Sequence, residues 1–222
     1  MTMRVAVVAM ACEFPGASTP EELWATALYG RRCFRSIPPE RLATQDYPNV
    51  DSDGIYPIEA GLLEGYTFDR AKFRVPQSAF LRTDMAHWLA LDVASRALGG
   101  LSSGSVEAER DNIAVIVANT LTGEFSRAQV LRYRWPFVAR AMRTAASDIA
   151  FPPEQFDVFM AATETAYKEP LPVPDEDSLA GGLSNTIAGR IANHHGLRGG
   201  AHTVDGACAS SLVAVTSACE RL

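Results

Sequence analysis

A cysteine surrounded by small residues is the segment of this chain whose composition best suits covalent chemistry. Cys208 lies within Val204–Leu212 (VDGACASSL), where a β-like run enters a turn and leaves as a helix. A thiol at the start of a helix feels the positive end of the helix dipole, which favours the thiolate. Gly206, Ala207 and Ala209 leave room for a thioester to approach the sulfur. The segment therefore predicts a nucleophile that accepts an acyl group.

The backbone amide of Cys208 is a second candidate catalytic group. An N–H at the start of a helix has no partner within the helix, so it can donate to the oxyanion of a tetrahedral intermediate. The other interpretation of Cys208 is a buried structural thiol, the usual situation of a free cysteine. The local sequence leaves both interpretations open. Cys12, Cys33 and Cys219 match no metal-ligand spacing, so we expect them to be structural or incidental and expect no metal site.

The elements that must position Cys208 alternate between strand and helix patterns. Apolar runs predict buried strands at Arg4–Ala9 and Ile113–Ala118, and a short strand is expected at Ala201–Asp205. Strands that alternate with crossover helices indicate a layered α/β protein. Helices are expected at 20–30 with Thr19 and Glu22 forming a capping box, at 83–98 with Thr83 as cap, at 124–146 with a kink or restart at Pro136, at 153–168, at 184–195 ended by Gly196, and at 208–222. Residues 34–75 and 169–178 are expected to be mostly loop.

Composition and charge exclude several classes of protein. The 222 residues carry 20 Lys+Arg and 26 Asp+Glu, a net charge of −6, so nucleic acid and anionic membranes are poor partners. The apolar runs are far shorter than the roughly 18 residues that a membrane-spanning helix needs. No signal-peptide pattern opens the chain, and its four cysteines form no CxxC pair; we therefore expect a cytoplasmic protein. Five arginines between 127 and 143 indicate a solvated helix face, or else a docking surface for an acidic partner.

The cysteine segment resembles the active-site elbow of β-ketoacyl synthases of the thiolase superfamily, which usually reads D-T/A-A-C-S/A-S-S-L. Asp205, Ala207, Cys208 and Ser210–Leu212 match this pattern. The resemblance implies a thiolase-like layered α/β/α fold, N-terminal half only, and covers nearly the whole chain. It extends to Val5–Ala17, where Ala9 replaces a commoner Gly, and to Pro20–Gly30, Phe68–Phe73 and Leu183–Leu197, the last containing Ala188-Gly189-Arg190-Ile191.

Three further segments suggest a subtype. Thr83–Leu91 (TDMAHWLAL), Asn119–Glu124 (NTLTGE) and Arg132–Pro136 (RYRWP) are not typical of modular polyketide synthases. They look like the ketosynthase of iterative enediyne polyketide synthases, large bacterial multidomain enzymes that build a polyene. Ketosynthases of polyunsaturated-fatty-acid synthases are the neighbouring alternative.

The resemblance implies both the reaction and the partners. Cys208 would accept an acyl chain from the phosphopantetheine arm of an acyl carrier protein. A malonyl unit on the carrier would then lose carbon dioxide, and the resulting carbanion would attack the thioester, giving a β-ketoacyl chain two carbons longer. The chain itself is expected to bind no cofactor. In this family the strand before the cysteine, here Ala201–Asp205, pairs across the two-fold axis of a homodimer.

The family stabilises the enolate with two histidines that follow the cysteine, and this chain matches neither. His87, His194, His195 and His202 all precede Cys208. We expect His87 to be a packing or surface residue, His194-His195 to carry a partial positive charge at a helix end, and His202 to be the one that could approach the site. Residues 1–222 are thus expected to be the N-terminal part of a ketosynthase domain within a larger enzyme. Such a part would expose a large apolar face and would not complete condensation.

Two other functions remain open at this stage. Gly206–Ser210 approaches the G-x-[S/C]-x-G elbow of α/β-hydrolases, which would make the chain a cysteine hydrolase. Against this, the preceding AHTVD strand lacks a continuous apolar run, and Ser210 stands where the final glycine belongs. The second alternative is an inert dimerisation fragment. Ketosynthase-like proteins without activity have lost the cysteine, whereas Cys208 is retained here.

Overall fold

The computed structural model describes residues 4–43, 59–120 and 123–222, and the chain divides into two compact units. Unit 1 comprises Met1–Phe68 and Asp92–Val106, and unit 2 comprises Asp69–Leu91 and Glu107–Leu222. Part of the expected 34–75 loop, residues 44–58, lies outside the described residues, as do Leu121 and Thr122 of the subtype segment. Cys208 belongs to unit 2, so the fold of that unit decides its position.

The first helix of unit 1 begins where its capping signal predicts. Helix α1 (Pro20–Leu28) is capped by Thr19, whose hydroxyl accepts the N–H of Glu22 at 3.2 Å. The Glu22 carboxylate accepts the Thr19 N–H in return, which completes the expected capping box. Strands β1 (Phe34–Ser36) and β2 (Glu59–Gly61) then form a short antiparallel pair within the expected loop region.

The buried strand expected at Arg4–Ala9 is wrong. These residues form no strand in the structure, and Val7 and Val8 are 77% and 74% exposed. An apolar run predicts burial, but a strand also needs a partner to complete its hydrogen-bond ladder. Among the described residues of unit 1 no strand pairs with this segment. Composition alone was therefore insufficient here.

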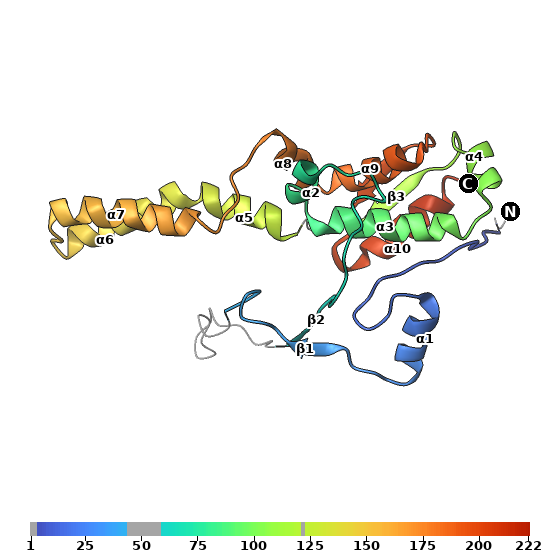
Figure 1. Cartoon of the computed structure of the whole chain (residues 1–222), viewed down its shortest axis with the longest axis horizontal. Helices are drawn as coiled ribbons and strands as arrows, with labels where there is room; N and C mark the ends of the chain where they lie inside the picture. Colours follow the sequence, from blue (N-terminus) through green and yellow to red (C-terminus); the bar gives the residue numbers. More distant parts are fainter. Residues whose placement is uncertain (1–3, 44–58, 121–122) are drawn as a thin grey trace. The chain divides into compact units, whose positions relative to one another are not determined.

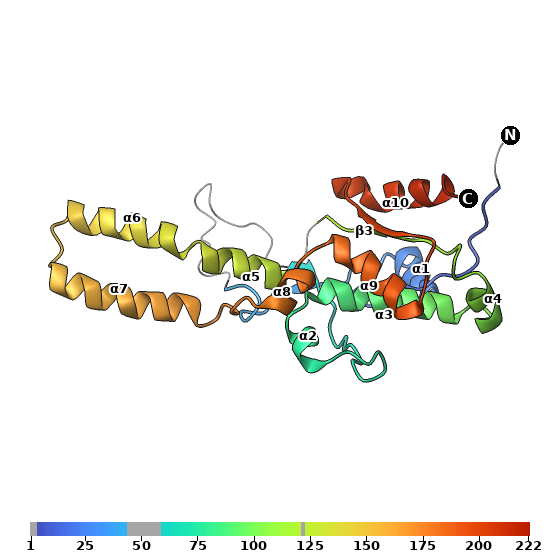
Figure 2. The same ribbon diagram turned by 90° about the horizontal axis from the view of Figure 1, so that it is seen from above.

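Unit 2 is built around two parallel strands, β3 (Val115–Ala118) and β4 (Ala201–Val204). Their register pairs Val115 with Ala201 and Ala118 with Val204, so both strands end at the same level. Helix α9 (Asn185–His195) packs on one face and helix α10 (Ser210–Cys219) on the other, as Figure 2 shows. The expected α/β/α layering is confirmed. Of α10, Leu212 and Val215 are 73% and 61% exposed, the apolar exposure that the sequence led us to expect.

The remaining helices largely follow the predicted ranges. Helix α5 (Glu124–Tyr133) stops and α6 (Trp135–Asp148) restarts with Pro136 in its first turn, because proline cannot continue the hydrogen bonds of the preceding helix. Helix α7 (Pro153–Lys168) lies beside α6 in Figure 1, and Trp135, Ala139 and Met160 are buried between them. The other helices are α2 (Gln77–Leu81), α3 (Met85–Gly99), α4 (Ser103–Ala108) and α8 (Glu176–Gly181). Helix α8 shortens the loop expected at 169–178, because Asp175 caps it.

His87 lies on the buried face of α3. His87, Trp88 and Leu91 are each 1% exposed or less, and α3 begins at Met85 rather than at Thr83. The Arg190 guanidinium of α9 lies 4.6 Å from the centre of the Trp88 ring. Neither ring nitrogen of His87 has a hydrogen-bond partner within the described part of the chain. His87 is therefore a packing residue, as one of the two interpretations predicted.

Gly199 lies very close to the backbone of Asn112 and Ile113, just before the β3–β4 pairing begins. A larger residue at position 199 is therefore expected to lower the free energy of unfolding. A Cβ there would lie 2.6 Å from the Ile113 carbonyl carbon and 2.7 Å from that of Asn112. Gly199→Ala should destabilise the protein by about 1–3 kcal/mol in urea unfolding. The control is Gly189→Ala on the exposed side of α9, where no atom lies within 4 Å. This control should gain about 0.5–1 kcal/mol. Equal stabilities for the two variants would contradict the account.

His87 predicts a pH dependence of stability. Burial, assisted by the charge of Arg190, lowers the pKa of His87 from 6.5 to about 4. Between pH 6.5 and pH 4, His87 is protonated in the unfolded chain but neutral in the folded chain. The free energy of unfolding therefore falls as the pH drops from 6.5 to 4. His87→Leu should remove about 3 kcal/mol of this loss, measured by urea unfolding at pH 7.5 and pH 4.5. The same loss in both proteins would show that His87 is not its source.

Candidate functional site

Cys208 lies in a tight turn between β4 and α10. Strand β4 ends at Val204, a short 3₁₀ turn covers Ala207–Ala209, and α10 begins at Ser210. The Cys208 side chain is exposed, which excludes the buried structural thiol as an interpretation of this conformation. The strand–turn–helix arrangement is confirmed, with one correction. Regular helix starts two residues after Cys208, because the turn tightens to 3₁₀ geometry first.

The backbone just before Cys208 is strained. Ala207 has φ +50°, in the left-handed region that residues with a Cβ rarely adopt. The Asp205 carboxylate accepts the Ala207 N–H at 2.9 Å and so supports this conformation. A Cβ at Gly206 would lie 3.2 Å from Val213 Cγ2, so the turn also passes close to α10. The small residues predicted around the sulfur are thus needed for the turn itself.

The Ser210 hydroxyl ties this turn to the first residue of α10. It donates to the Ala207 carbonyl at 2.7 Å and accepts the Gly206 N–H at 2.9 Å. Ser210 is 6% exposed, so these bonds form away from water. One buried side chain therefore holds both residues that precede the cysteine.

Thr120 reaches the same turn from the end of β3. The Asn119 N–H donates to the Val204 carbonyl at 3.2 Å, which extends the β3–β4 ladder by one step. The Thr120 hydroxyl then lies 3.2 Å from Ser210 Oγ and 3.4 Å from the Ala207 carbonyl oxygen. The sequence contained no signal for this contact, because 90 positions separate Thr120 from Ser210.

The geometry gives Cys208 two free chemical groups. Its thiol is exposed, and across the described residues its backbone N–H has no hydrogen-bond partner. An unpaired N–H beside a nucleophilic sulfur is an arrangement that can stabilise an oxyanion formed at that sulfur. The amide predicted as a donor is therefore available for that role.

Among the described interactions, no hydrogen bond or ring contact joins His87, His194 or His202 to Cys208. His202 pairs with Ile116 within the β3–β4 ladder, and no described hydrogen bond or ring contact joins it to the cysteine. The His194 ring lies 5.2 Å from that of Phe73. Burial, with the neighbouring charges of His194 and Arg110, lowers the pKa of His195 and favours its neutral form. This lowering of the pKa argues against the partial positive charge expected at this helix end for His195.

Asp84 is a second residue that the sequence did not mark as part of the site. Its side chain accepts the Phe125 N–H at 2.7 Å, at the start of α5. A Cβ at Gly123 would lie 3.2 Å from this carboxylate, which shows how closely the two segments approach. The subtype segments Thr83–Leu91 and Asn119–Glu124 thus meet beside the strand end that carries Thr120.

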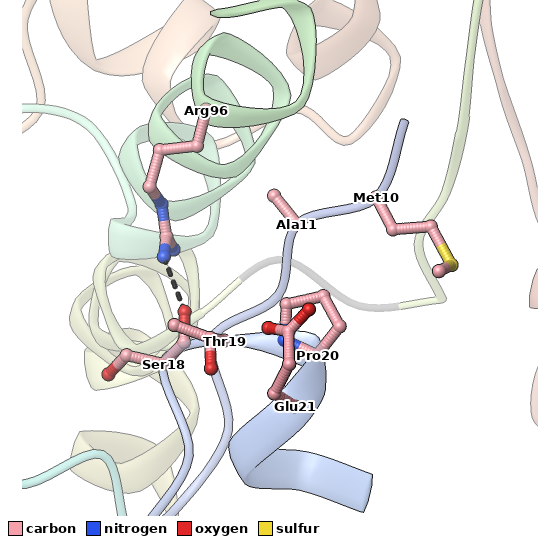
Figure 3. Close-up of a pocket in the computed structure, with 7 residues that line it drawn as sticks. All are labelled: Met10, Ala11, Ser18, Thr19, Pro20, Glu21 and Arg96. Carbon is pink, nitrogen blue, oxygen red and sulfur yellow. Dashed lines mark hydrogen bonds between the residues drawn. The ribbon is translucent and has the colours of Figure 1, made fainter. Parts of the chain in front are cut away.

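Unit 1 holds a separate open pocket of about 360 Å³, shown in Figure 3. Arg96 reaches across it and donates to the Ser18 carbonyl at 2.8 Å. Glu13 also binds the Arg96 guanidinium, at 2.9 Å, so this cation is already paired. The other lining residues are Met10, Ala11, Thr19, Pro20 and Glu21. None of the lining residues is a cysteine, so this pocket offers no thiol to compete with Cys208.

We find neither a metal centre nor a membrane-spanning helix in residues 4–43, 59–120 and 123–222. No three His, Cys, Asp or Glu side chains among them converge in a way that could hold a metal ion. None of the helices there is long and apolar enough to cross a lipid bilayer.

Known proteins resemble this chain over nearly its whole length. One relative belongs to the polyunsaturated fatty acid synthase of Thraustochytrium sp.; it is 29% identical over 225 residues, covering 100% of this chain and 8% of that protein. The spectinabilin polyketide synthase system protein NorC from Streptomyces orinoci is 31% identical over 229 residues, covering 98% of this chain and 8% of that protein. The chain thus spans less than a tenth of the length of these relatives.

Solved structures share the fold. An oxazolomycin ketosynthase domain from Streptomyces albus JA3453 superimposes with a TM-score of 0.65 at 17% identity, over 96% of this chain and 31% of that one. A ketosynthase of the bacillaene synthase from Bacillus subtilis 168 gives 0.63 at 19% identity, over 98% and 29%. Both matches support a thiolase-like α/β fold corresponding to the first part of a ketosynthase. Residues 2–222 match the family described as β-ketoacyl synthase, N-terminal domain, and the chain therefore belongs to the β-ketoacyl synthase family.

Proposed function

We propose that Cys208 is the acyl-accepting nucleophile of a ketosynthase domain that elongates carrier-bound polyketide or fatty acyl chains. The observation that carries this proposal is the turn itself: an exposed thiol with an unpaired backbone N–H, held next to a strained Ala207. Strain at a position that surrounding hydrogen bonds maintain is typical of functional sites. Membership of the β-ketoacyl synthase family supplies the reaction class.

In the first half-reaction, the Cys208 sulfur attacks the carbonyl carbon of an acyl thioester on the phosphopantetheine arm of a carrier protein. The carbonyl oxygen becomes an oxyanion, which the Cys208 N–H is placed to stabilise. The tetrahedral intermediate then expels the carrier thiolate, which takes up the proton that the cysteine lost. The acyl chain remains on Cys208, and the difficult carbon–carbon bond formation is left to a second step.

In that second step a malonyl thioester loses carbon dioxide and its enolate attacks the carbonyl carbon of the Cys208 thioester. The new carbon–carbon bond replaces the carbon–sulfur bond, and Cys208 leaves as a thiolate that takes up a proton. The family's two enolate-stabilising histidines follow the cysteine, whereas the four histidines of this chain precede it. From the described residues we therefore derive the acyl-loading step alone. We propose that condensation requires enolate-stabilising groups other than these four histidines.

Within the family we propose an iterative, polyene-forming subtype of the enediyne kind. Support comes from the segments Thr83–Leu91, Asn119–Glu124 and Arg132–Pro136. The first two approach closely, since a Cβ at Gly123 would lie 3.2 Å from the Asp84 carboxylate. The similarity to the polyunsaturated fatty acid synthase of Thraustochytrium sp. keeps that kind of synthase as the second candidate.

Removing the thiol tests the central proposal. The 222-residue chain is incubated with an acyl-N-acetylcysteamine thioester, a short mimic of the phosphopantetheine arm, and its acyl adduct is measured by peptide mass spectrometry. Cys208→Ala should form no adduct, because the alanine offers no nucleophile. The matched control, Cys219→Ala at the end of α10, should load as the unaltered chain does. Loading that persists in Cys208→Ala, or that maps to Cys12 or Cys33, would refute the assignment.

We also propose that β4 pairs with its copy across a two-fold axis in a homodimer. The bonds that Gly200 and Val204 accept from β3 show that alternate residues of β4 face β3. The backbone groups of Ala201 and Thr203 therefore face the other edge of β4, where no strand pairs within the described part of unit 2. An open strand edge is well suited to pairing with a second chain.

A proline at this edge tests the dimer. Ala201→Pro removes an N–H from the open edge, at the first residue of the strand where proline is tolerated. Loss of the bond from each copy should weaken self-association about tenfold or more in analytical ultracentrifugation. The thermal midpoint should change little when both proteins are compared as monomers. An unaltered chain that stays monomeric, or an equally tight dimer of the variant, would count against pairing through β4.

A further inference from the structure

The first residue of α10 shapes the turn that carries Cys208. We propose that Ser210 is a positioning residue that holds Cys208 in its reactive geometry, and that Thr120 fixes the direction of the Ser210 hydroxyl. This inference rests on the proposed role of Cys208 as nucleophile.

The hydrogen-bond capacity of Ser210 is completely used. A serine hydroxyl has one hydrogen to donate and two lone pairs to accept with. Its hydrogen goes to the Ala207 carbonyl, 2.7 Å away, and one lone pair accepts the Gly206 N–H at 2.9 Å. The other lone pair faces the Thr120 hydroxyl at 3.2 Å. Because the Ser210 hydrogen is committed to Ala207, the Thr120 hydroxyl is the donor in this third contact, and it shares its hydrogen with the Ala207 carbonyl oxygen, 3.4 Å away.

These three bonds hold the strained part of the turn. Ala207 keeps φ +50° while its carbonyl is bonded to Ser210 and its N–H to Asp205. Without the Ser210 hydroxyl, the Gly206 N–H loses its partner. The Ala207 carbonyl keeps only the Ser210 backbone N–H and the longer contact with Thr120, so the backbone can relax toward ordinary φ values. A change in the peptide unit between Ala207 and Cys208 reorients the Cys208 N–H. The oxyanion donor and the sulfur would then no longer converge on one carbonyl group.

The chain offers a matched control in the next residue. Ser211 is also in the first turn of α10, but it is exposed, and no described hydrogen bond involves its side chain. Ser210→Ala and Ser211→Ala therefore make the same chemical change one residue apart. They differ in whether the lost hydroxyl held the turn.

The experiment compares two reagents on the folded 222-residue chain. One is the acyl-N-acetylcysteamine thioester, whose transfer forms an oxyanion, and the other is iodoacetamide, whose reaction forms none. Ser210→Ala should lower the maximal acylation rate of Cys208 about 10- to 100-fold and leave the half-saturating thioester concentration within about twofold. Alkylation by iodoacetamide should change by less than about threefold, because the thiol stays exposed. Ser211→Ala should match the unaltered chain in both reactions.

Thr120→Val tests the same positioning role if Ser210→Ala fails to fold. This substitution removes a hydroxyl from an exposed residue with little change of shape. It should lower the acylation rate about fivefold, as expected for one lost hydrogen bond. In a Ser210→Ala background the same substitution should add less than about twofold, because Thr120 acts through Ser210.

The outcomes separate this inference from the proposed function. If Cys208→Ala abolishes loading while Ser210→Ala and Thr120→Val both load at the unaltered rate, the positioning role is refuted and the nucleophile stands. If Ser210→Ala slows both reagents equally, the effect is a general loss of structure and the positioning role is likewise refuted. A Thr120→Val effect of full size in both backgrounds would refute its action through Ser210. Loading that persists in Cys208→Ala refutes the function itself.

Discussion

The parallel register of β3 and β4 is the constraint on which the candidate site depends. Because Ala118 pairs with Val204, the two strands end at the same level, and the residues that follow them leave the sheet side by side. The Asn119 N–H then adds one more bond to the Val204 carbonyl. That single step places Thr120 against the turn that holds Cys208. Gly199 makes the register possible, because any larger residue would collide with the backbone that leads into β3.

The turn itself is stabilised mainly through its backbone. Asp205, Ser210 and Thr120 direct polar groups at the peptide units of Gly206 and Ala207, and none of the three is bonded to the Cys208 sulfur. Because these side chains bond to the main chain of the turn, the sulfur and the backbone N–H of Cys208 stay free to react. This division explains the composition of the segment: glycine and alanine where the chain turns, and hydroxyl or carboxylate groups where the turn must be held.

Local signals in the sequence were reliable where one residue decides the outcome. The Thr19–Glu22 capping box, the restart at Pro136 and the left-handed Gly196 each act within one helical turn, and each appears as predicted. The strand at Arg4–Ala9 failed, because pairing depends on residues elsewhere in the chain. The same distinction applies to the site. Cys208 could be identified from its neighbours, whereas the contact between Thr120 and Ser210 exists only once the register of β3 and β4 has formed.

The residues around the proposed nucleophile differ in how general they are. Asp205, Ala207, Cys208 and Ser210 match the family pattern, so the turn and its internal support suit any ketosynthase. Thr120 and Asp84 instead lie in the segments on which the proposed subtype rests. Asp84 anchors the start of α5 through Phe125, and the Thr120 hydroxyl lies 3.2 Å from Ser210 Oγ, so neither is bonded to the sulfur. The turn that matches the family pattern is thus supported by Thr120, a residue outside that pattern. Variation in such supports can adjust the orientation of an acyl group without altering the nucleophile that receives it.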